Sequence, residues 1–155
     1  MHYYGFKMQL MITQKGVPIS VGITSANLHD VKYLGLLDNK AQLSDYELIA
    51  DKGYLSAQYQ TRLFEEDKIK LITPLRRNMI SRKDNWNKAY RYIRKRIETL
   101  FSQLCDQMMF KRNYAKTFNG LVTRVVTKVN AVAVLQYLNF INGRPINKLK
   151  NALFI

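Results

Sequence analysis

Apolar and polar residues alternate along the first part of the chain with a period of two. This alternation predicts one strand over residues 4–13 and a second strand over residues 17–23. Gln14, Lys15 and Gly16 between them are turn-forming residues, so the two strands are predicted to form an antiparallel hairpin. Pro18 has no amide hydrogen to donate, which places the second strand at a sheet edge.

A loop follows the hairpin and leads into a short helix, predicted from Asp30 to Leu37. Asn27 or Asp30 is a candidate N-cap, because both side chains can accept a hydrogen bond from an amide of the first turn. We expect His29 and Asp30 to bond to the loop backbone. That role is structural, and we prefer it over a role in ligand binding.

An acid stands at the end of the next apolar run. Residues 46–50 predict a buried strand that delivers Asp51 at its carboxyl end, before the chain turns at Gly53. Sheets of α/β proteins place their ligand-binding groups at such ends. Alternatively, Asp51 caps the segment that follows it. We prefer the first interpretation, because Ser56 is the better cap for the helix predicted over residues 57–67. Residues 69–73 predict a further strand.

The most informative segment is Tyr90–Leu104, whose apolar residues share one helical face. Those residues are Ile93, Ile97, Leu100, Phe101 and Leu104. Glu98 falls beside this apolar face, in a row with Arg91, Arg94 and Ser102, and not on the outer face. A carboxylate at the boundary of the core, between arginines, is either half of a structural ion pair or a ligand directed at a site.

A long helix is predicted from Phe118 to Phe140, ending at Gly143 and Pro145. Its predicted core face consists of Leu121, Val122, Val125, Val126, Val129, Val132 and Ala133. Polar residues at positions 128, 130, 136 and 139 interrupt its most apolar stretch, so we do not expect it to span a membrane. With the strands and helices before it, this helix predicts a mixed α/β sheet covered by helices.

Charge narrows the function classes. The chain has 155 residues, a length typical of one domain, and carries a formal charge of +14. Such a charge favours a polyanionic partner, with nucleic acid ahead of an anionic membrane surface. A ribosomal or merely basic protein is the alternative. One cysteine and two histidines exclude an internal disulfide and a zinc site built from these residues. No signal peptide is recognisable, so we expect an intracellular protein.

Residues 75–86 form a basic segment without apolar periodicity. Its cationic side chains are Arg76, Arg77, Arg82 and Lys83. We interpret it as a loop that lies along a phosphate backbone, with a merely solvated charge run as the alternative.

Four stretches, in this order, resemble the Asp-Asp-Glu transposases of bacterial insertion sequences, and insertion-sequence family 982 in particular. They are Tyr4-Gly5-Phe6-Lys7, Thr24 with His29-Asp30, Ile49 to Tyr54, and Tyr92 to Leu104. The resemblance covers residues 3–142. It implies a partial catalytic domain over residues 1–142 and a C-terminal tail over residues 143–155. It implies a ribonuclease-H-like core.

By this resemblance, Asp51 is the second catalytic acid and Glu98 the third. Carboxylates suit this chemistry, because two hard cations such as Mg²⁺ or Mn²⁺ can activate a nucleophile and stabilise the leaving oxygen. Arg94 matches the arginine of a related signature and would orient Glu98 or hold a phosphate. That signature has tyrosine where this chain has Arg91 and lysine where it has Cys105, so the match is partial.

The resemblance also implies partners. Double-stranded DNA, both transposon ends and target, would contact Lys52, Arg91 and Lys95 besides the basic segment. We also expect a homo-oligomer in the transposition complex and no membrane association. The expected location is the cytoplasm of a bacterium, at the nucleoid when the protein is bound to DNA.

The family's first aspartate lies on a central strand upstream of the hairpin, and we expect this chain to lack it. The chain alone would then neither cleave nor join DNA, and its sheet would have a gap or a rearranged pairing. The strand would be lost or supplied by another chain. The alternative function is that of a non-catalytic, basic DNA-binding remnant of a transposase.

Overall fold

The computed structural model describes residues 5–37, 43–75 and 88–154. The chain divides into two compact units. We call residues 1–7 and 24–94 the first unit and residues 8–23 and 95–155 the second unit. Each unit is described by itself.

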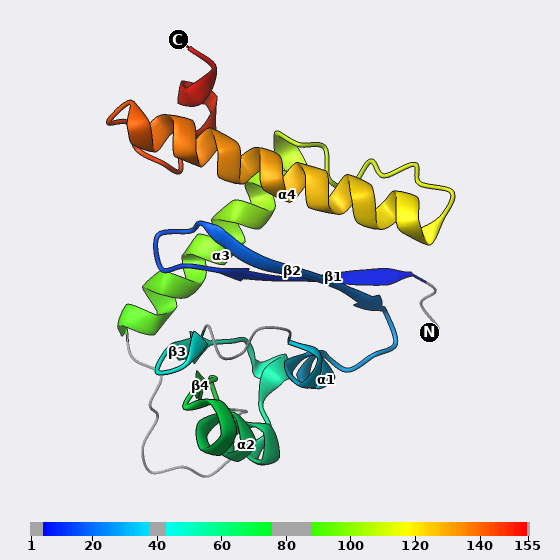
Figure 1. Cartoon of the computed structure of the whole chain (residues 1–155), viewed down its shortest axis with the longest axis vertical. Helices are drawn as coiled ribbons and strands as arrows, with labels where there is room; N and C mark the ends of the chain where they lie inside the picture. Colours follow the sequence, from blue (N-terminus) through cyan, green and yellow to red (C-terminus); the bar gives the residue numbers. More distant parts are fainter. Residues whose placement is uncertain (1–4, 38–42, 76–87, 155) are drawn as a thin grey trace. The chain divides into compact units, whose positions relative to one another are not determined.

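The N-terminal hairpin is confirmed. Strands β1 (Phe6–Ile12) and β2 (Pro18–Ser25) form a two-stranded sheet (Figure 1). The Thr13 amide donates to the Val17 carbonyl at 2.8 Å, and Gly16 adopts a φ of 90°, which only glycine reaches without strain. The alternation does not hold throughout, since Phe6 is 54% exposed whereas Gln9 is buried.

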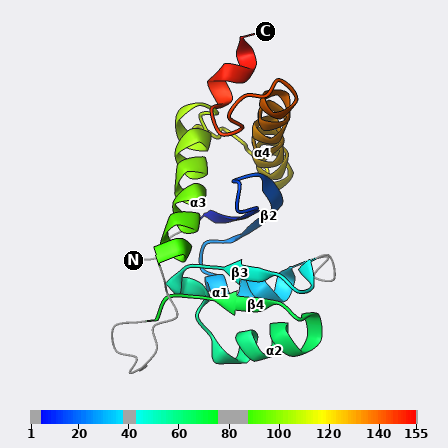
Figure 2. The ribbon, with the colours of Figure 1, turned by 90° about the vertical axis from the view of Figure 1, so that its left-hand side faces the viewer.

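A parallel strand pair organises the first unit. Strands β3 (Glu47–Ile49) and β4 (Lys70–Ile72) lie side by side (Figure 2). They pair in parallel, with Leu48 opposite Leu71. Helix α2 (Ala57–Asp67) connects them, as parallel strands require. Its predicted bounds and its Ser56 cap are confirmed, with the Ser56 side chain accepting from the Tyr59 amide at 3.4 Å.

The short helix before β3 differs from its prediction at the cap. It consists of α1 (Asp30–Tyr33) followed by the 3₁₀ turn η1 (Leu34–Leu36). Its N-cap is His29, which makes no side-chain capping bond. The assignment of Asn27 or Asp30 as the cap was therefore wrong, and Asp30 has a different partner, described below.

Two long helices contribute most of the core of the second unit. Helix α3 (Lys88–Asp106) begins in the first unit and continues through the second, and α4 (Phe118–Ile141) follows it. A short 3₁₀ segment, η4 (Leu149–Leu153), comes last. Their buried core residues are Leu100, Leu104, Val129, Val132 and Leu149, and side chains from the hairpin pack against them: Met8, Leu10, Ile12 and Val21.

Helix α4 buries polar residues that the sequence suggested only as interruptions. The predicted core positions Val125, Val129 and Val132 are buried, but so are Gln136 and Asn139. The nitrogen of each side-chain amide has partners, whereas Gln136 Oε1 and Asn139 Oδ1 are buried without a hydrogen bond, an exception to the usual pairing of buried polar groups. Asn139 Nδ2 donates to the carbonyls of Ile146 and Lys148 at 3.4 and 2.9 Å. Gln136 Nε2 donates to the carbonyl of Gly16 at 2.9 Å, tying the hairpin turn to the helix.

By length and composition alone, α4 is the one helix in the described part of the chain that is long and apolar enough to cross a membrane. Buried core helices meet the same criterion, and α4 supplies Val129 and Val132 to the core of the second unit. Only 22% of its apolar window is buried inside the protein, so the predicted absence of α4 from a membrane stays a prediction.

The mixed α/β class is confirmed by these elements. The expectation of one sheet is not, because the strands within the described ranges form two separate two-stranded sheets, β1–β2 and β3–β4. Neither sheet contains a strand that joins it to the other.

Candidate functional site

Asp51 lies just beyond the carboxyl end of β3, as predicted, but the prediction that this strand is buried was wrong, because Glu47 is exposed and Leu48 and Ile49 are only half-buried. The preceding Ala50 amide donates to the Ile72 carbonyl at 2.9 Å, which extends the pairing of the two parallel strands to the edge of the site. Asp51 is the N-cap of the 3₁₀ turn η3 (Lys52–Tyr54), and its Oδ1 accepts from the Lys52 amide at 2.7 Å. Asp51 therefore does cap the segment that follows it. The inference that Ser56 leaves Asp51 without a capping role was wrong, since each residue caps a different turn.

Arg94 lies beside Asp51. Its Nη1 atom is 3.7 Å from Asp51 Oδ1, with the two side chains 39% and 59% exposed. At that distance and exposure the ion pair contributes little to stability, because water screens both charges. Its electrostatic effect is local: a fixed positive charge stands next to an accessible carboxylate. The sequence interpretation linked Arg94 to Glu98 or to a phosphate, and this contact with Asp51 was missed.

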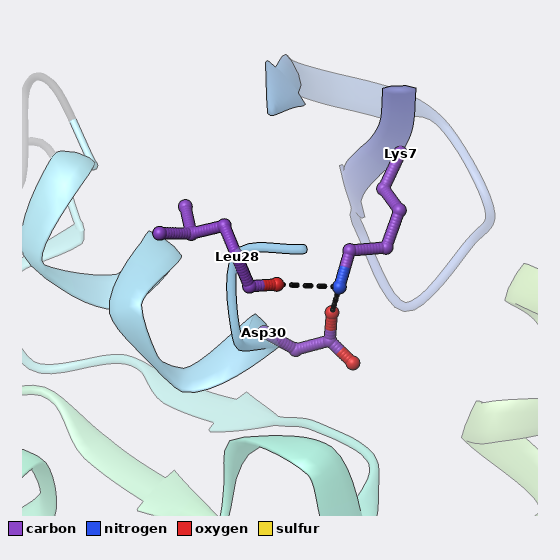
Figure 3. A network of polar contacts seen from close by, with 3 residues as sticks. All are labelled: Lys7, Leu28 and Asp30. Carbon is purple, nitrogen blue, oxygen red and sulfur yellow. Dashed lines mark hydrogen bonds and ion pairs between the residues drawn. The ribbon is translucent and has the colours of Figure 1, made fainter. Parts of the chain in front are cut away.

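A second acid supports the same turn from α1. Asp30 Oδ1 accepts from Lys7 Nζ at 2.8 Å, and the same ammonium donates to the Leu28 carbonyl at 2.5 Å (Figure 3). Asp30 Oδ2 lies against the backbone of Gly53, where an added Cβ would approach it to 2.8 Å. The expected bonding of Asp30 to the loop backbone was wrong; it pairs with Lys7, and Lys7 bonds to the loop.

Tyr54 closes the turn on its other side. Its amide donates to the Asp51 carbonyl at 3.0 Å. Burial of the phenol and the negative charges of Asp30 and Asp51 raise the pKa of Tyr54 to about 12. The phenol therefore remains protonated at neutral pH and cannot act as a base there.

Glu98 occupies the part of α3 that belongs to the second unit, whereas Asp51 belongs to the first. Glu98 is exposed, which contradicts its predicted place at the boundary of the core. The predicted apolar face is nevertheless confirmed near the C-terminal end of the segment, where Leu100 and Leu104 are buried. A helical wheel gives the direction in which each side chain leaves the helix. It does not show how far neighbouring segments cover the helix, and for this reason the exposure of Glu98 was not predicted.

The cationic residues predicted to contact DNA divide into two groups. Lys52, Arg91 and Lys95 are exposed, as phosphate contacts require. Arg76, Arg77, Arg82 and Lys83 lie outside the described residues.

The first turns of α3 are attached to the parallel strands. Glu47 on β3 accepts from Lys70 Nζ on β4 at 2.8 Å and from the Tyr90 hydroxyl at 3.4 Å. The hydrogen bond from Lys70 is the main cause that lowers the pKa of Glu47 below its usual value. This network fixes the start of α3 beside the strands that precede the Asp51 turn, all within the first unit.

Neither a preformed metal cluster nor an apolar hollow in the second unit offers a second candidate among the described residues. Within the three described ranges, no group of three His, Cys, Asp or Glu side chains could hold a metal. A hollow of about 880 Å³ in the second unit is lined mainly by apolar side chains, including Met108, Val134 and Leu135. Such a lining does not suit phosphate chemistry. The turn at Asp51 therefore remains the candidate site.

Comparison with known proteins gives the family. Neither a curated protein nor a solved structure matched the chain. A family model described as "Transposase DDE domain" matches residues 1–116, which include Asp51, Arg94 and Glu98. That match covers well over half of the 155 residues, and so the chain belongs to the DDE-domain transposases.

Proposed function

We propose that this chain is a metal-dependent DNA transposase domain in which Asp51 and Glu98 are the second and third catalytic acids. The observation that carries the proposal is the family match, together with an accessible Asp51 at the carboxyl end of β3 with Arg94 beside it. The reaction class is cleavage of a phosphodiester and transfer of the strand at insertion-sequence ends. Insertion-sequence family 982 and a ribonuclease-H-like core remain part of this proposal.

The donor chemistry fits a hard cation. Asp51 and Glu98 offer carboxylate oxygens, which Mg²⁺ and Mn²⁺ prefer over nitrogen or sulfur ligands. A bound pair of such ions supplies activation of a hydroxyl nucleophile and stabilisation of the leaving oxygen. The chain's own contribution is to hold Asp51 through its cap on the Lys52 amide, which leaves the side chain 59% exposed to solvent.

Arg94 has two consistent roles in this proposal. Without ligand, its guanidinium lies 3.7 Å from Asp51 and partly balances the carboxylate charge. In the complex with DNA, its planar fork of donors would suit Arg94 to bind a phosphate oxygen. Together with the exposed Lys52, Arg91 and Lys95, it would hold DNA by its backbone.

We further propose that the described residues do not complete the catalytic site. A third carboxylate is needed, and the described residues contain no group of three His, Cys, Asp or Glu side chains that could hold a metal. The two separate strand pairs leave ladder positions at which a strand carrying that acid could add. The chain alone is then expected to bind DNA without cleaving it. We infer a cytoplasmic, nucleoid-associated location from the DNA partner.

The experiment measures Mn²⁺ binding and DNA binding on the same purified chain. Isothermal titration should detect Mn²⁺ binding that Asp51→Asn and Glu98→Gln both weaken at least tenfold, whereas Glu66→Gln, which removes an exposed acid on α2, should leave it unchanged. Fluorescence anisotropy with duplex DNA should show log K falling by about 0.9 per log salt for each phosphate neutralised.

The second candidate function, a DNA-binding remnant without chemistry, is favoured by the absence of a three-residue metal cluster in the described part of the chain. It predicts the same salt dependence of DNA binding but no Mn²⁺ binding that depends on Asp51 or Glu98. Mg²⁺-dependent cleavage by the chain alone, abolished by Asp51→Ala, would contradict both the remnant and the incomplete site.

A further inference from the structure

We infer that Asp30 is a positioning residue that holds the η3 turn, and thereby Asp51, in place. This inference rests on the proposed role of Asp51 as a metal ligand. It gives a function to Lys7 and Asp30, two residues that the catalytic assignment does not use.

The physical connection begins at the start of β1. Lys7 Nζ makes two short contacts, to the Leu28 carbonyl at 2.5 Å and to Asp30 Oδ1 at 2.8 Å (Figure 3). The ammonium thereby joins the loop before α1 to the first residue of that helix. Both side chains are partly shielded, at 34% and 41% exposure, so the pair is less screened than a fully exposed one. The Asp30 carboxylate is consequently held from one side by a defined donor.

The other oxygen of Asp30 meets the turn. Gly53 lies so close to Asp30 Oδ2 that a Cβ at this position would be 2.8 Å away, and Asp30 Cβ and Cγ would follow at 3.5 and 3.6 Å. Gly53 is not among the residues with positive φ, so the backbone conformation does not explain glycine here. The missing side chain does: it lets the Asp30 carboxylate lie directly on the turn backbone.

The turn transmits this contact to Asp51. Gly53 is the middle residue of η3, whose N-cap is Asp51. The Lys52 amide donates to Asp51 Oδ1 at 2.7 Å, and the Tyr54 amide donates to the Asp51 carbonyl at 3.0 Å. A displacement of Gly53 therefore moves both amides that fix the backbone and side chain of Asp51. Outer partners that orient a metal ligand commonly change metal affinity about 10–100-fold when they are lost.

The test uses nuclear magnetic resonance of the full chain, because one spectrum gives two readouts. Amide hydrogen exchange at Lys52 and Tyr54 reports the turn, and broadening of the same signals during Mn²⁺ titration reports the ligand. Asp30→Ala should accelerate exchange at both amides and raise the Mn²⁺ concentration needed for broadening about tenfold. Lys7→Met should act in the same direction, and Glu66→Gln on α2 should do neither.

Gly53→Ala separates positioning from general destabilisation. Alone, it should weaken Mn²⁺ binding about as much as Asp30→Ala, because its new methyl displaces the turn from the carboxylate. Combined with Asp30→Ala, which removes the obstructing oxygen, it should add little further loss. Fully multiplicative effects of the two substitutions would overturn the inference.

The outcomes also distinguish this inference from the proposed function. If Asp51→Asn weakens Mn²⁺ broadening but Asp30→Ala changes neither readout, the inference fails and the proposed function stands. If Asp51→Asn leaves the Mn²⁺ broadening unchanged, the proposed function fails. If, in addition, Asp30→Ala leaves amide exchange at Lys52 and Tyr54 unchanged, the positioning of the turn by Asp30 is rejected as well.

Discussion

Replacing the buried Asn139 by aspartate tests how the C-terminal segment is attached to α4. The side chain is 0% exposed, and its Nδ2 donates to two carbonyls, at 2.9 and 3.4 Å. Asn139→Asp keeps the shape but replaces the donor by an oxygen that faces those carbonyls. An uncompensated buried charge costs about 3–5 kcal/mol. With a urea m value of about 2 kcal/mol per molar, the unfolding midpoint should fall by roughly 1.5–2.5 M at pH 7.

Asn142→Asp is the matched control. It makes the same chemical change on the last turn of the same helix, but Asn142 is exposed and bonds only to the Leu138 carbonyl of its own helix, at 2.7 Å. An acid near the C-terminus of a helix is unfavourable by about 0.3–1 kcal/mol. The control should therefore shift the midpoint by no more than roughly 0.5 M.

Acid pH provides the refuting measurement. Burial raises the pKa of a carboxyl at position 139 above its unfolded value, so its neutral form is favoured in the folded state. Stability relative to wild type is then highest below the unfolded pKa of about 3.9 and declines as pH rises through the folded pKa. Urea unfolding followed by circular dichroism at several pH values measures this. Equal effects at positions 139 and 142, or a position-139 effect independent of pH, would refute the reasoning.

Three further outcomes are expected. Ser56→Ala should lower the free energy of unfolding by about 0.5–1 kcal/mol. This is the low end for a lost N-cap, because the hydrogen bond from the Tyr59 amide is 3.4 Å long. An unchanged thermal midpoint would contradict this prediction. Tyr54 should ionise near pH 12 in ultraviolet difference spectra recorded against Tyr54→Phe. Its contribution to the free energy of unfolding should be fully present below pH 10 and lost as pH rises past 12. Ionisation at the ordinary pKa of 10 would count against burial of the phenol. The pKa of Glu47, followed by carbon NMR, should lie below 4.5 and return toward that value in Lys70→Met. The contribution of Glu47 to the free energy of unfolding is then present above pH 4.5 and lost as pH falls. The same pKa in both proteins would exclude the Lys70 hydrogen bond as the cause.

Local chemistry predicted the elements well. The bounds of α2 follow from Ser56 at one end and a left-handed Lys68 at the other, both set by neighbouring atoms. The hairpin followed from alternation and a glycine turn. Gln136 and Asn139 were interpreted as polar interruptions, because nothing in the local pattern shows that the C-terminal segment returns to cover them.

The site was predictable in its residue types and not in its contacts. Asp51 at the carboxyl end of a strand could be found from sequence, since the apolar run and the acid after it were enough, but the expected burial of that strand was wrong. The contact of Asp51 with Arg94 and the contact between Asp30 and Gly53 could not be found from sequence, because both join segments far apart in the chain. Gly53 was predicted only to let the chain turn, whereas in the structure it also leaves space for the Asp30 carboxylate. The contacts of a short polar motif can be read only when the fold is known, because the residues it contacts lie elsewhere in the sequence.

The attachment of the hairpin turn has a consequence for the order of events during synthesis. The carbonyls of Gly16 and Lys15 bond to Gln136 and Asn147, which lie 120 and 132 residues later. At about 5–20 residues per second, a ribosome needs roughly 7–26 s to deliver them. Until then, Met8, Leu10 and Ile12 lack part of the core that covers them, because Leu149 follows Gln136 and Asn147 in the chain. The nascent hairpin therefore keeps its turn carbonyls without these partners for that time, and the second unit can close only after residue 147 has been synthesised.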